Sequence, residues 1–392
     1  MRNTLRSNII NLYLIKIAKW FMLFMPIVVL FYEDNGLEMR HVFILQAIYS
    51  VSIVALEIPS GYLADAVGRK ITLIMGTILG FFGFLTYSFS YGFMGFLVAE
   101  VILGIGQSLI SGADSALLYD TLLENGKSEN YIKHEGRMIS VGNFAEAIAG
   151  IAGGLIATLS LRYPYYAQTI ISLIGIPAAF LLYEPKSKKE LIKIKFKDIL
   201  TIVKYSLYDN YELKWNIIFS SVIGAATLTM AWFVQPYFKL VALPLSWFGI
   251  MWTLLNLTVG VSSMYAHKVE SYFKFRKVMI AFAILIPAGF IIVSRINMLW
   301  GISILFLFYI VRGIATPVLK DYINRLCSSD VRATVLSVRN FVIRVIFAII
   351  GPFVGWYNDK FSLQAALLIT GIIFLLLAGL TLLMQLRKQR GN

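Results

Sequence analysis

The sequence predicts an all-α membrane protein with twelve transmembrane helices arranged as two six-helix halves. Its composition, its apolar runs and an internal repeat predict this fold. Of the 392 residues, 58% are hydrophobic and 14% are charged, whereas soluble domains have roughly 45–50% and about 25%. One helical span needs about 20 mostly apolar residues, so twelve spans use about 240 and leave short loops. The composition excludes a soluble domain and a disordered chain.

Apolar runs give the twelve predicted spans in order. They cover residues 9–31, 41–64, 71–89, 93–119, 137–160, 165–183, 215–237, 245–265, 277–295, 298–319, 333–357 and 361–385. The first run is not a cleavable signal peptide, because it contains Lys16 and Lys19 and eleven more spans follow it.

Lysine and arginine residues in the loops place both termini in the cytoplasm. With the N-terminus inside, the cytoplasmic segments contain 25 of the 35 basic residues and the outer loops contain five. Cytoplasmic loops of membrane proteins carry such an excess. The net charge of +14 therefore reflects topology and contact with anionic lipid, and we expect no nucleic-acid partner.

The longest loop, residues 184–214, divides the chain at its midpoint. Eight lysines alternate there with apolar residues, a pattern typical of an amphipathic helix on the inner membrane face. The predicted domains are an N-terminal six-helix bundle over 1–183, this basic linker, and a C-terminal six-helix bundle over 215–392. A plain linker is the simpler interpretation of the loop, and a regulatory site there is the alternative.

Short matches between the halves indicate an internal duplication. Ser140-Val-Gly-Asn-Phe144 opens the fifth span and Ser337-Val-Arg-Asn-Phe341 opens the eleventh. Gly112 and Asp120 near the end of the fourth span correspond to Gly313 and Asp321 in the tenth. Secondary transporters built from such repeats place their site between the two halves.

The loop after the second span carries the most specific motif. It reads Gly61-Tyr-Leu-Ala-Asp65-Ala-Val-Gly68-Arg69-Lys70, and it resembles the signature loop of the major facilitator superfamily. We expect Gly61 to let helices approach, Gly68 to make a sharp turn, and Asp65 to cap a helix or pair with arginine. Arg69 and Lys70 would anchor the turn at the anionic inner surface.

The resemblance covers nearly the whole chain and implies the major facilitator fold, most like bacterial twelve-span drug/proton antiporters. Two motifs depart from the antiporter pattern. The fifth span has Ala149-Gly150-Ile-Ala-Gly153-Gly154 in place of a Gly/Pro motif, and Glu100 stands where an arginine is usual. The arginine's role in proton coupling therefore cannot be carried over to Glu100.

Charged residues inside the predicted spans lie on spans that the resemblance places toward the centre. The candidates for proton coupling are carboxylates: Glu57, Asp114 and Glu146. Burial raises the pKa of a carboxyl group, and a nearby cation resets it. From the fold, we expect Glu57 to meet Arg339 or Arg344, and Glu146 to meet Lys19. A structural ion pair is the alternative for each, and it is favoured for Glu100.

Basic, amide and aromatic side chains on the same spans are the candidates for substrate binding. They are Lys19, Asn143, Trp232, Gln235, Arg312, Arg339, Asn340 and Arg344. We predict proton-coupled export of drugs or amphipathic compounds by alternating access. The alternative is a proton-coupled or facilitative carrier of an organic anion bound by Arg312, Arg339 and Arg344.

The sequence carries no sign of an enzyme or a bound cofactor. It has no P-loop, no metalloprotease motif and no complete dinucleotide motif. One cysteine and three scattered histidines predict neither a disulfide nor a metal site. The expected partners are a small-molecule substrate, protons or else sodium, and the lipid bilayer. The resemblance implies a working monomer in a bacterial inner membrane.

Overall fold

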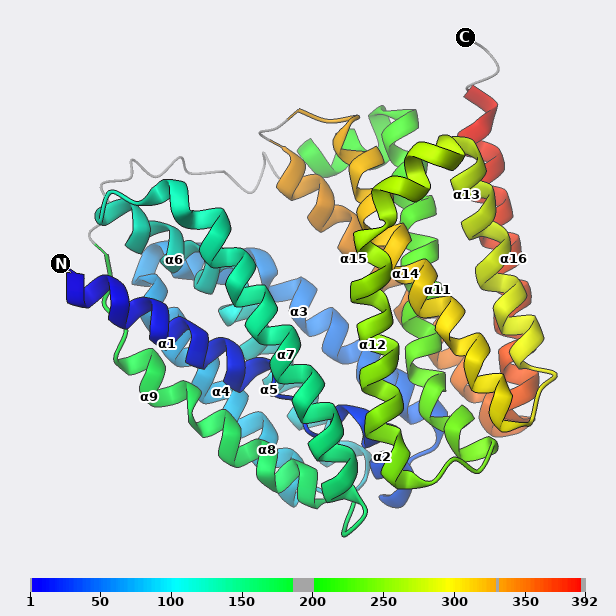
Figure 1. The fold of residues 1–392 in the computed structure, drawn as a ribbon, viewed down its shortest axis with the longest axis horizontal. Coiled ribbons are helices and arrows are strands. Elements are labelled where there is room, and N and C mark those ends of the chain that lie inside the picture. The colour runs from blue at the N-terminus through cyan, green and yellow to red at the C-terminus, as the bar shows by residue number, and fades with distance from the viewer. Residues whose placement is uncertain (1, 186–200, 329–330, 389–392) are drawn as a thin grey trace. The chain divides into compact units, whose positions relative to one another are not determined.

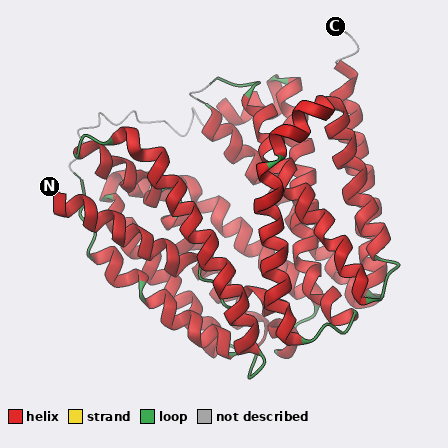
Figure 2. Cartoon of the chain, in the orientation of Figure 1, coloured by secondary structure: helices red, strands yellow, loops and turns green. Residues whose placement is uncertain are grey.

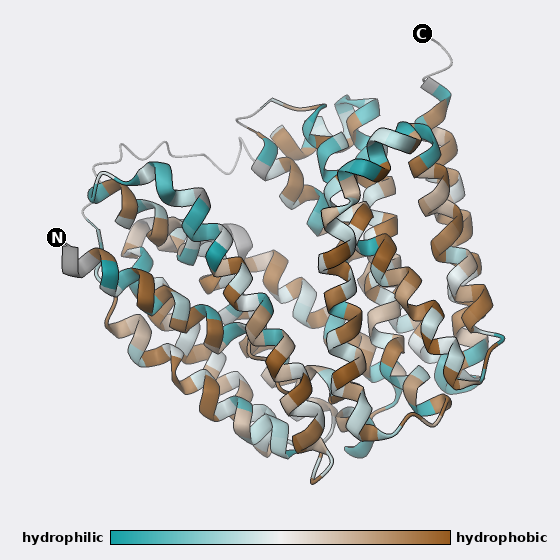
Figure 3. Ribbon diagram, viewed as in Figure 1, coloured by the Kyte–Doolittle hydropathy of each residue, from teal (hydrophilic) through white to brown (hydrophobic). Residues whose placement is uncertain are grey.

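The computed structural model describes residues 2–185, 201–328 and 331–388, and it confirms the all-helical fold. In Figure 2 the described residues form helices and loops, without a strand. Among them, eleven helical segments are long and apolar enough to cross a membrane. The predicted sixth span lies in two shorter helices, so twelve spans are consistent with this structure. Figure 3 shows hydrophobic residues along the long helices.

The chain forms two compact units (Figure 1). The first contains Met1–Leu37, the chain from Ile48 to the linker, and Pro244–Thr253. Its helices are α1 (Arg2–Trp20), α2 (Val28–Asp34), α4 (Arg69–Phe89), α5 (Gly92–Ile110), α6 (Ala113–Glu124), α7 (Tyr131–Ala157), α8 (Tyr163–Leu173) and α9 (Gly175–Phe180). The domain bounds expected from the sequence stay a prediction.

The second unit contains Glu38–Ala47, the chain from the linker to Leu243, and Leu254–Asn392. Its helices are α11 (Tyr211–Leu240), α13 (Ala266–Val293), α14 (Ile302–Asn324), α15 (Arg332–Lys360) and α16 (Leu363–Lys388). The helices α3 (Met39–Val67) and α12 (Phe248–Met264) have residues in both units. Asp359 at the end of α15 accepts hydrogen bonds from the backbone N–H groups of Met39 and Arg40, which caps the start of α3.

Three predicted spans of the first unit are interrupted, each for a local reason. Between α1 and α2, Pro26 lacks an N–H group and disfavours helix in the residue before it. Between α5 and α6, Gly112 adopts a positive φ of 86°. The break between α8 and α9 is at Ile174, and Pro177 within α9 cannot donate to the carbonyl of Leu173. These breaks set the directions of the side chains that follow them.

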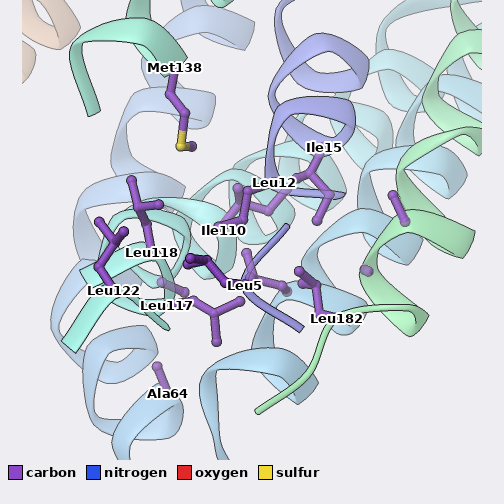
Figure 4. Packing of buried hydrophobic residues seen from close by; sticks show 14 residues of the cluster. Leu5, Leu12, Ile15, Ala64, Ile110, Leu117, Leu118, Leu122, Met138 and Leu182 are labelled. Atoms are coloured by element: carbon purple, nitrogen blue, oxygen red, sulfur yellow. The ribbon is translucent and has the colours of Figure 1, made fainter. Parts of the chain in front are cut away.

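Apolar side chains of the first unit pack together at the cytoplasmic half of α1. Figure 4 shows Leu12 and Ile15 of α1 with Leu117 and Leu118 of α6 in one cluster, and Met138 from α7 above it. This cluster fixes α1 against α6, the two helices that carry the buried charges described below.

Most of the predicted amphipathic linker lies outside the described residues. Its last part is helical from residue 201 and becomes a π-helix over Tyr205–Asp209. Ile202 and Leu207 pack against buried residues of α11, α14 and α15 in the second unit. In this described part, the apolar side chains therefore contact protein.

Candidate functional site

The signature loop is a tight turn whose following helix is capped by a distant carboxylate. Gly68 joins α3 to α4 with φ 102° and ψ 147°, a conformation that favours glycine. Glu184, which follows the sixth span, accepts hydrogen bonds from the backbone N–H groups of Arg69 (3.1 Å) and Lys70 (2.6 Å). The carboxylate lies where the positive end of the helix dipole favours it.

Arg69 also connects this loop to the end of the fourth span. Its guanidinium donates to the carbonyl of Ala116 at 2.7 Å and forms an ion pair with Asp120. The side chains of Arg69 and Asp120 are 13% and 5% exposed, so the pair is shielded from water and screened little. The loop is thus held to α6 as well as to Glu184.

Gly61 differs from the expectation for the motif, and the side chain of Asp65 is not among the described ones. No heavy atom lies within 4 Å of a Cβ built at Gly61, so the expected close helix approach is absent at this glycine in the described structure. The side chain of Asp65 lies outside the described part, as does that of Glu57. Their predicted roles stay predictions.

A buried ion pair joins α1 to α6 inside the first unit. Lys16 Nζ lies 3.5 Å from Asp114 Oδ2, and the two side chains are 13% and 9% exposed. Asp114 stands in the first turn of α6, directly after the break at Gly112, where a carboxylate is favoured by the helix N-terminus. Removal of one partner of a buried ion pair costs about 3–5 kcal/mol, because the other charge is then buried without a partner.

The other described candidates of the first unit lie on α1 and α7. Lys19 follows Lys16 by about one helical turn on α1. Lys16 Nζ also lies 5.9 Å from the centre of the Trp20 ring. Glu146 is half-buried on α7, whereas Asn143 is exposed. The expected pairing of Glu146 with Lys19 stays a prediction.

A buried arginine in the second unit has neutral partners. Arg339 on α15 is 5% exposed. Its Nε donates to Ser220 Oγ on α11 at 2.5 Å, and its Nη1 donates to Asn340 Oδ1 at 3.2 Å. No carboxylate pairs with Arg339 among residues 201–328 and 331–388 of this unit. A guanidinium so placed is suited to a carboxylate or phosphate group.

The remaining candidates of the second unit lie on the same or neighbouring helices. Arg312 on α14 and Arg344 on α15 are half-buried, and Asn340 is exposed. On α11, Gln235 is buried and Trp232 is half-buried. Of these candidates, Arg339 and Asn340 are joined by a hydrogen bond. Within the described part, the structure gives no hydrogen bond from Arg339 or Asn340 to Arg312 or Trp232.

Sequence reasoning missed several partners of these residues. The sequence signals that point to Glu184 and Ser220 are an acidic residue directly after a span and a serine pair in an apolar span. Lys16 was recognised as an intramembrane charge but not as the partner of Asp114. The break at Gly112 turns Asp114 toward α1, whereas the predicted span over 93–119 is one unbroken helix.

The fold and these charged contacts define a class of protein: a multi-pass membrane transporter of two helical units. The family model described as Major Facilitator Superfamily matches residues 12–352. The chain belongs to the major facilitator superfamily, a family of transporters and not of enzymes.

Curated relatives are similar over part of their length. A quinolone resistance protein NorA from Staphylococcus aureus (strain MRSA252) is 24% identical over 220 residues, covering 50% of this chain and 56% of the relative. An uncharacterized transporter from Buchnera aphidicola subsp. Schizaphis graminum is 26% identical over 240 residues, covering 58% and 56%. The chain thus spans about half the length of the curated relatives it matches.

Solved structures are similar in fold over almost the whole chain. The nucleoside transporter NupG has a TM-score of 0.78 at 15% identity, with 97% of this chain and 99% of that chain covered. A bacterial homolog of the human lysosomal transporter Spinster has a TM-score of 0.77 at 14% identity, with 98% of each chain covered. At these identities, the likeness shows the fold alone.

Proposed function

We propose that this transporter exports drugs or amphipathic compounds in exchange for protons. The observation that carries the proposal is the buried Lys16–Asp114 pair. Protonation of the Asp114 carboxylate removes the charge that holds Lys16. Asp114 can therefore either bind a proton or form the ion pair with Lys16, but not both. The similarity to proteins named for quinolone resistance supports a drug as the substrate.

In this mechanism the carboxylate takes up a proton from the outer side and gives it up in the cytoplasm. Alternating access exposes the site to one side at a time. Release of the proton restores the ion pair with Lys16, and substrate binding favours one state over the other by its differential affinity. Glu57 and Glu146 are further proposed coupling carboxylates. We propose that the working unit is a monomer in a bacterial inner membrane.

The test is transport in proteoliposomes with an imposed pH gradient and ethidium as the lipophilic cation. We expect Asp114→Asn to reduce gradient-driven flux at least about tenfold, because the proton-binding group is gone. Exchange of ethidium at equal pH should continue. Glu129→Gln removes an exposed carboxylate of the same unit and should transport normally.

Three further arms separate folding and coupling. Lys16→Gln combined with Asp114→Asn removes both charges and controls for loss of folding. Glu57→Gln tests the second-span carboxylate directly. Gradient-driven flux that persists in Asp114→Asn would refute Asp114 as the coupling group. Flux driven by a sodium gradient alone would show that sodium, and not the proton, is the coupling ion.

A second candidate function rests on the buried Arg339 with its neutral partners. An organic anion would give this guanidinium a carboxylate to bind. Flux of carboxyfluorescein that is lost in Arg339→Gln and kept in the exposed-site control Arg332→Gln would support this carrier. Ethidium export unaffected by Arg339→Gln would separate the two functions.

A further inference from the structure

A second buried carboxylate of the first unit takes no part in the function proposed above. Glu100 lies in the middle of α5 and is 5% exposed. Ionisable side chains inside a membrane span are costly, so they persist where they have partners or a function. A tyrosine hydroxyl donates a hydrogen bond to Glu100, whereas a lysine forms an ion pair with Asp114.

A chain of two tyrosine hydroxyls leads to Glu100 from neighbouring helices. Tyr32 on α2 donates to Glu100 Oε1 at 2.9 Å. The hydroxyls of Tyr32 and Tyr87 (α4) lie 2.5 Å apart, and either oxygen can be the donor. Tyr32 and Tyr87 are 0% and 2% exposed. These hydrogen bonds stabilise a negative charge on Glu100 in its buried position.

This chain of hydrogen bonds can run in both directions. With Glu100 ionised, Tyr87 donates to Tyr32 and Tyr32 donates to the carboxylate. With Glu100 protonated, the carboxyl O–H donates to Tyr32, whose hydroxyl turns to donate to Tyr87. Both protonation states keep the same two hydrogen bonds, which is the property of a site that accepts and releases a proton.

A third tyrosine and an arginine lie beside this hydrogen-bonded tyrosine pair. Tyr165 on α8 stacks on Tyr87 with ring centres 5.3 Å apart, and its buried hydroxyl has no hydrogen-bond partner in the described structure. The Cζ atom of Arg162 lies 5.0 Å from the ring centre of Phe31. On α3, which packs against α5 at Gly104, the segment 42–56 contains Tyr49 as its one ionisable side chain.

Tyr32 connects this site to the outer part of the broken first span. It belongs to α2, which follows the break after Trp20, and the backbone N–H of Leu23 within the break donates to the buried Gln168 side chain. A hydrogen bond to an ionised group is roughly twice as strong as a neutral one. The charge on Glu100 therefore strengthens the attachment of α2 to α5, beside the ring contacts of Phe31 and Tyr32 with Phe96.

We propose that Glu100 is a proton-binding site of the first unit, and that Tyr32 transmits its protonation to α2. The step takes one proton onto the carboxylate, reverses the two hydrogen bonds and weakens the attachment of α2. It uses no group of the Lys16–Asp114 pair, so it stands whether or not that pair couples transport.

Infrared difference spectroscopy of the purified, lipid-reconstituted protein between neutral and acidic pH tests the proton site. We expect a protonated-carboxyl band that is lost in Glu100→Gln and shifted in Tyr32→Phe and in Tyr87→Phe. Tyr166→Phe, next to Tyr165 on the same helix, and Asp114→Asn should keep this band unchanged. A spectrum unaltered by Glu100→Gln would overturn the proposal.

Amide hydrogen exchange over residues 28–34 tests the transmission. We expect exchange, corrected for its intrinsic pH dependence, to be about fivefold faster at acidic pH, because the charge-assisted hydrogen bond is replaced by a neutral one. Tyr32→Phe should remove this pH dependence while leaving the fold intact, and it therefore serves even if Glu100→Gln folds poorly. Exchange in Tyr32→Phe that keeps the wild-type pH dependence would refute the role of Tyr32.

Discussion

Repeat-related positions carry different residues in the two halves, and the structure shows the consequence. Gly142 and Arg339 hold the same place in the sequence repeat. The Cε atom of Lys16 lies 3.7 Å from a Cβ built at Gly142, so the small residue on α7 leaves room for a cation from α1. In the second unit the cation stands on α15 itself and Ser220 on α11 receives it. Each half thus has a cation between its first and fifth spans, but the first span carries it in one half and the fifth span carries it in the other.

The two glycines of the signature loop should respond oppositely to alanine. Gly68 has φ 102°, where a side chain costs roughly 1–3 kcal/mol, so Gly68→Ala should lower the thermal unfolding midpoint in detergent. Gly61 lies inside α3 with open space around its Cβ position, and Gly61→Ala should raise stability by about 0.5–1 kcal/mol. Equal effects of the two variants would contradict the turn geometry described above.

The sequence identified residue types at the site better than it identified their partners. Asp114 was a candidate because it is an acid inside a span, and Arg339 because it is a base inside a span. Their contacts with Lys16 and Ser220 depend on helix rotation, which shifts by about 100° for each residue gained or lost at a break. The irregular residues around Gly112 and Pro26 therefore limited what the sequence could give.

Among the elements, the first span illustrates how a break is stabilised inside a membrane. Backbone groups freed between α1 and α2 need partners, since lipid offers none. Gln168 accepts from the N–H of Leu23, and Gly153 on α7 lets the carbonyl of Leu23 approach closely, since a Cβ there would clash with it. The glycine-rich part of the fifth span thus serves the break in the first.

Alanine at Gly153 should disrupt this contact. Its Cβ would overlap the Leu23 carbonyl oxygen, a backbone atom that cannot move aside cheaply, so we expect a loss of about 1–3 kcal/mol or more. Gly80→Ala in α4 meets open space and is the matched control, with stability equal or slightly higher. Thermal unfolding of both variants in the same detergent decides the matter, and an unchanged midpoint for Gly153→Ala would be the contrary result.

At the scale of the whole molecule, the fold was predictable because its signals are long and repeated. Apolar runs of about 20 residues and a strong bias of basic residues between loops fix number and direction of the spans. The shorter α8 and α9 were anticipated as one helix, because a single proline within an apolar run does not reveal its effect on the span. A single sequence has no comparable signal for which side chains pack against each other inside each unit.

Cysteine accessibility checks the orientation. In a Cys327→Ser background, which removes the one native cysteine, Lys239→Cys should react with a membrane-impermeant maleimide applied to intact cells. Lys127→Cys should react only after the membrane is opened. Both lysines are in loops or at helix ends that the charge bias assigns to opposite sides. Labelling of Lys127→Cys in intact cells would reverse the topology.

The interruption at Ile174 has a consequence for biogenesis. Neither α8 nor α9 is long enough to cross a bilayer alone, and Pro177 leaves the Leu173 carbonyl without its helical donor. α8 packs against α4, and α9 packs against α1 and α4. We therefore expect the sixth segment to enter the membrane against α1 and α4, which are synthesised before it, so that its insertion depends on their prior insertion.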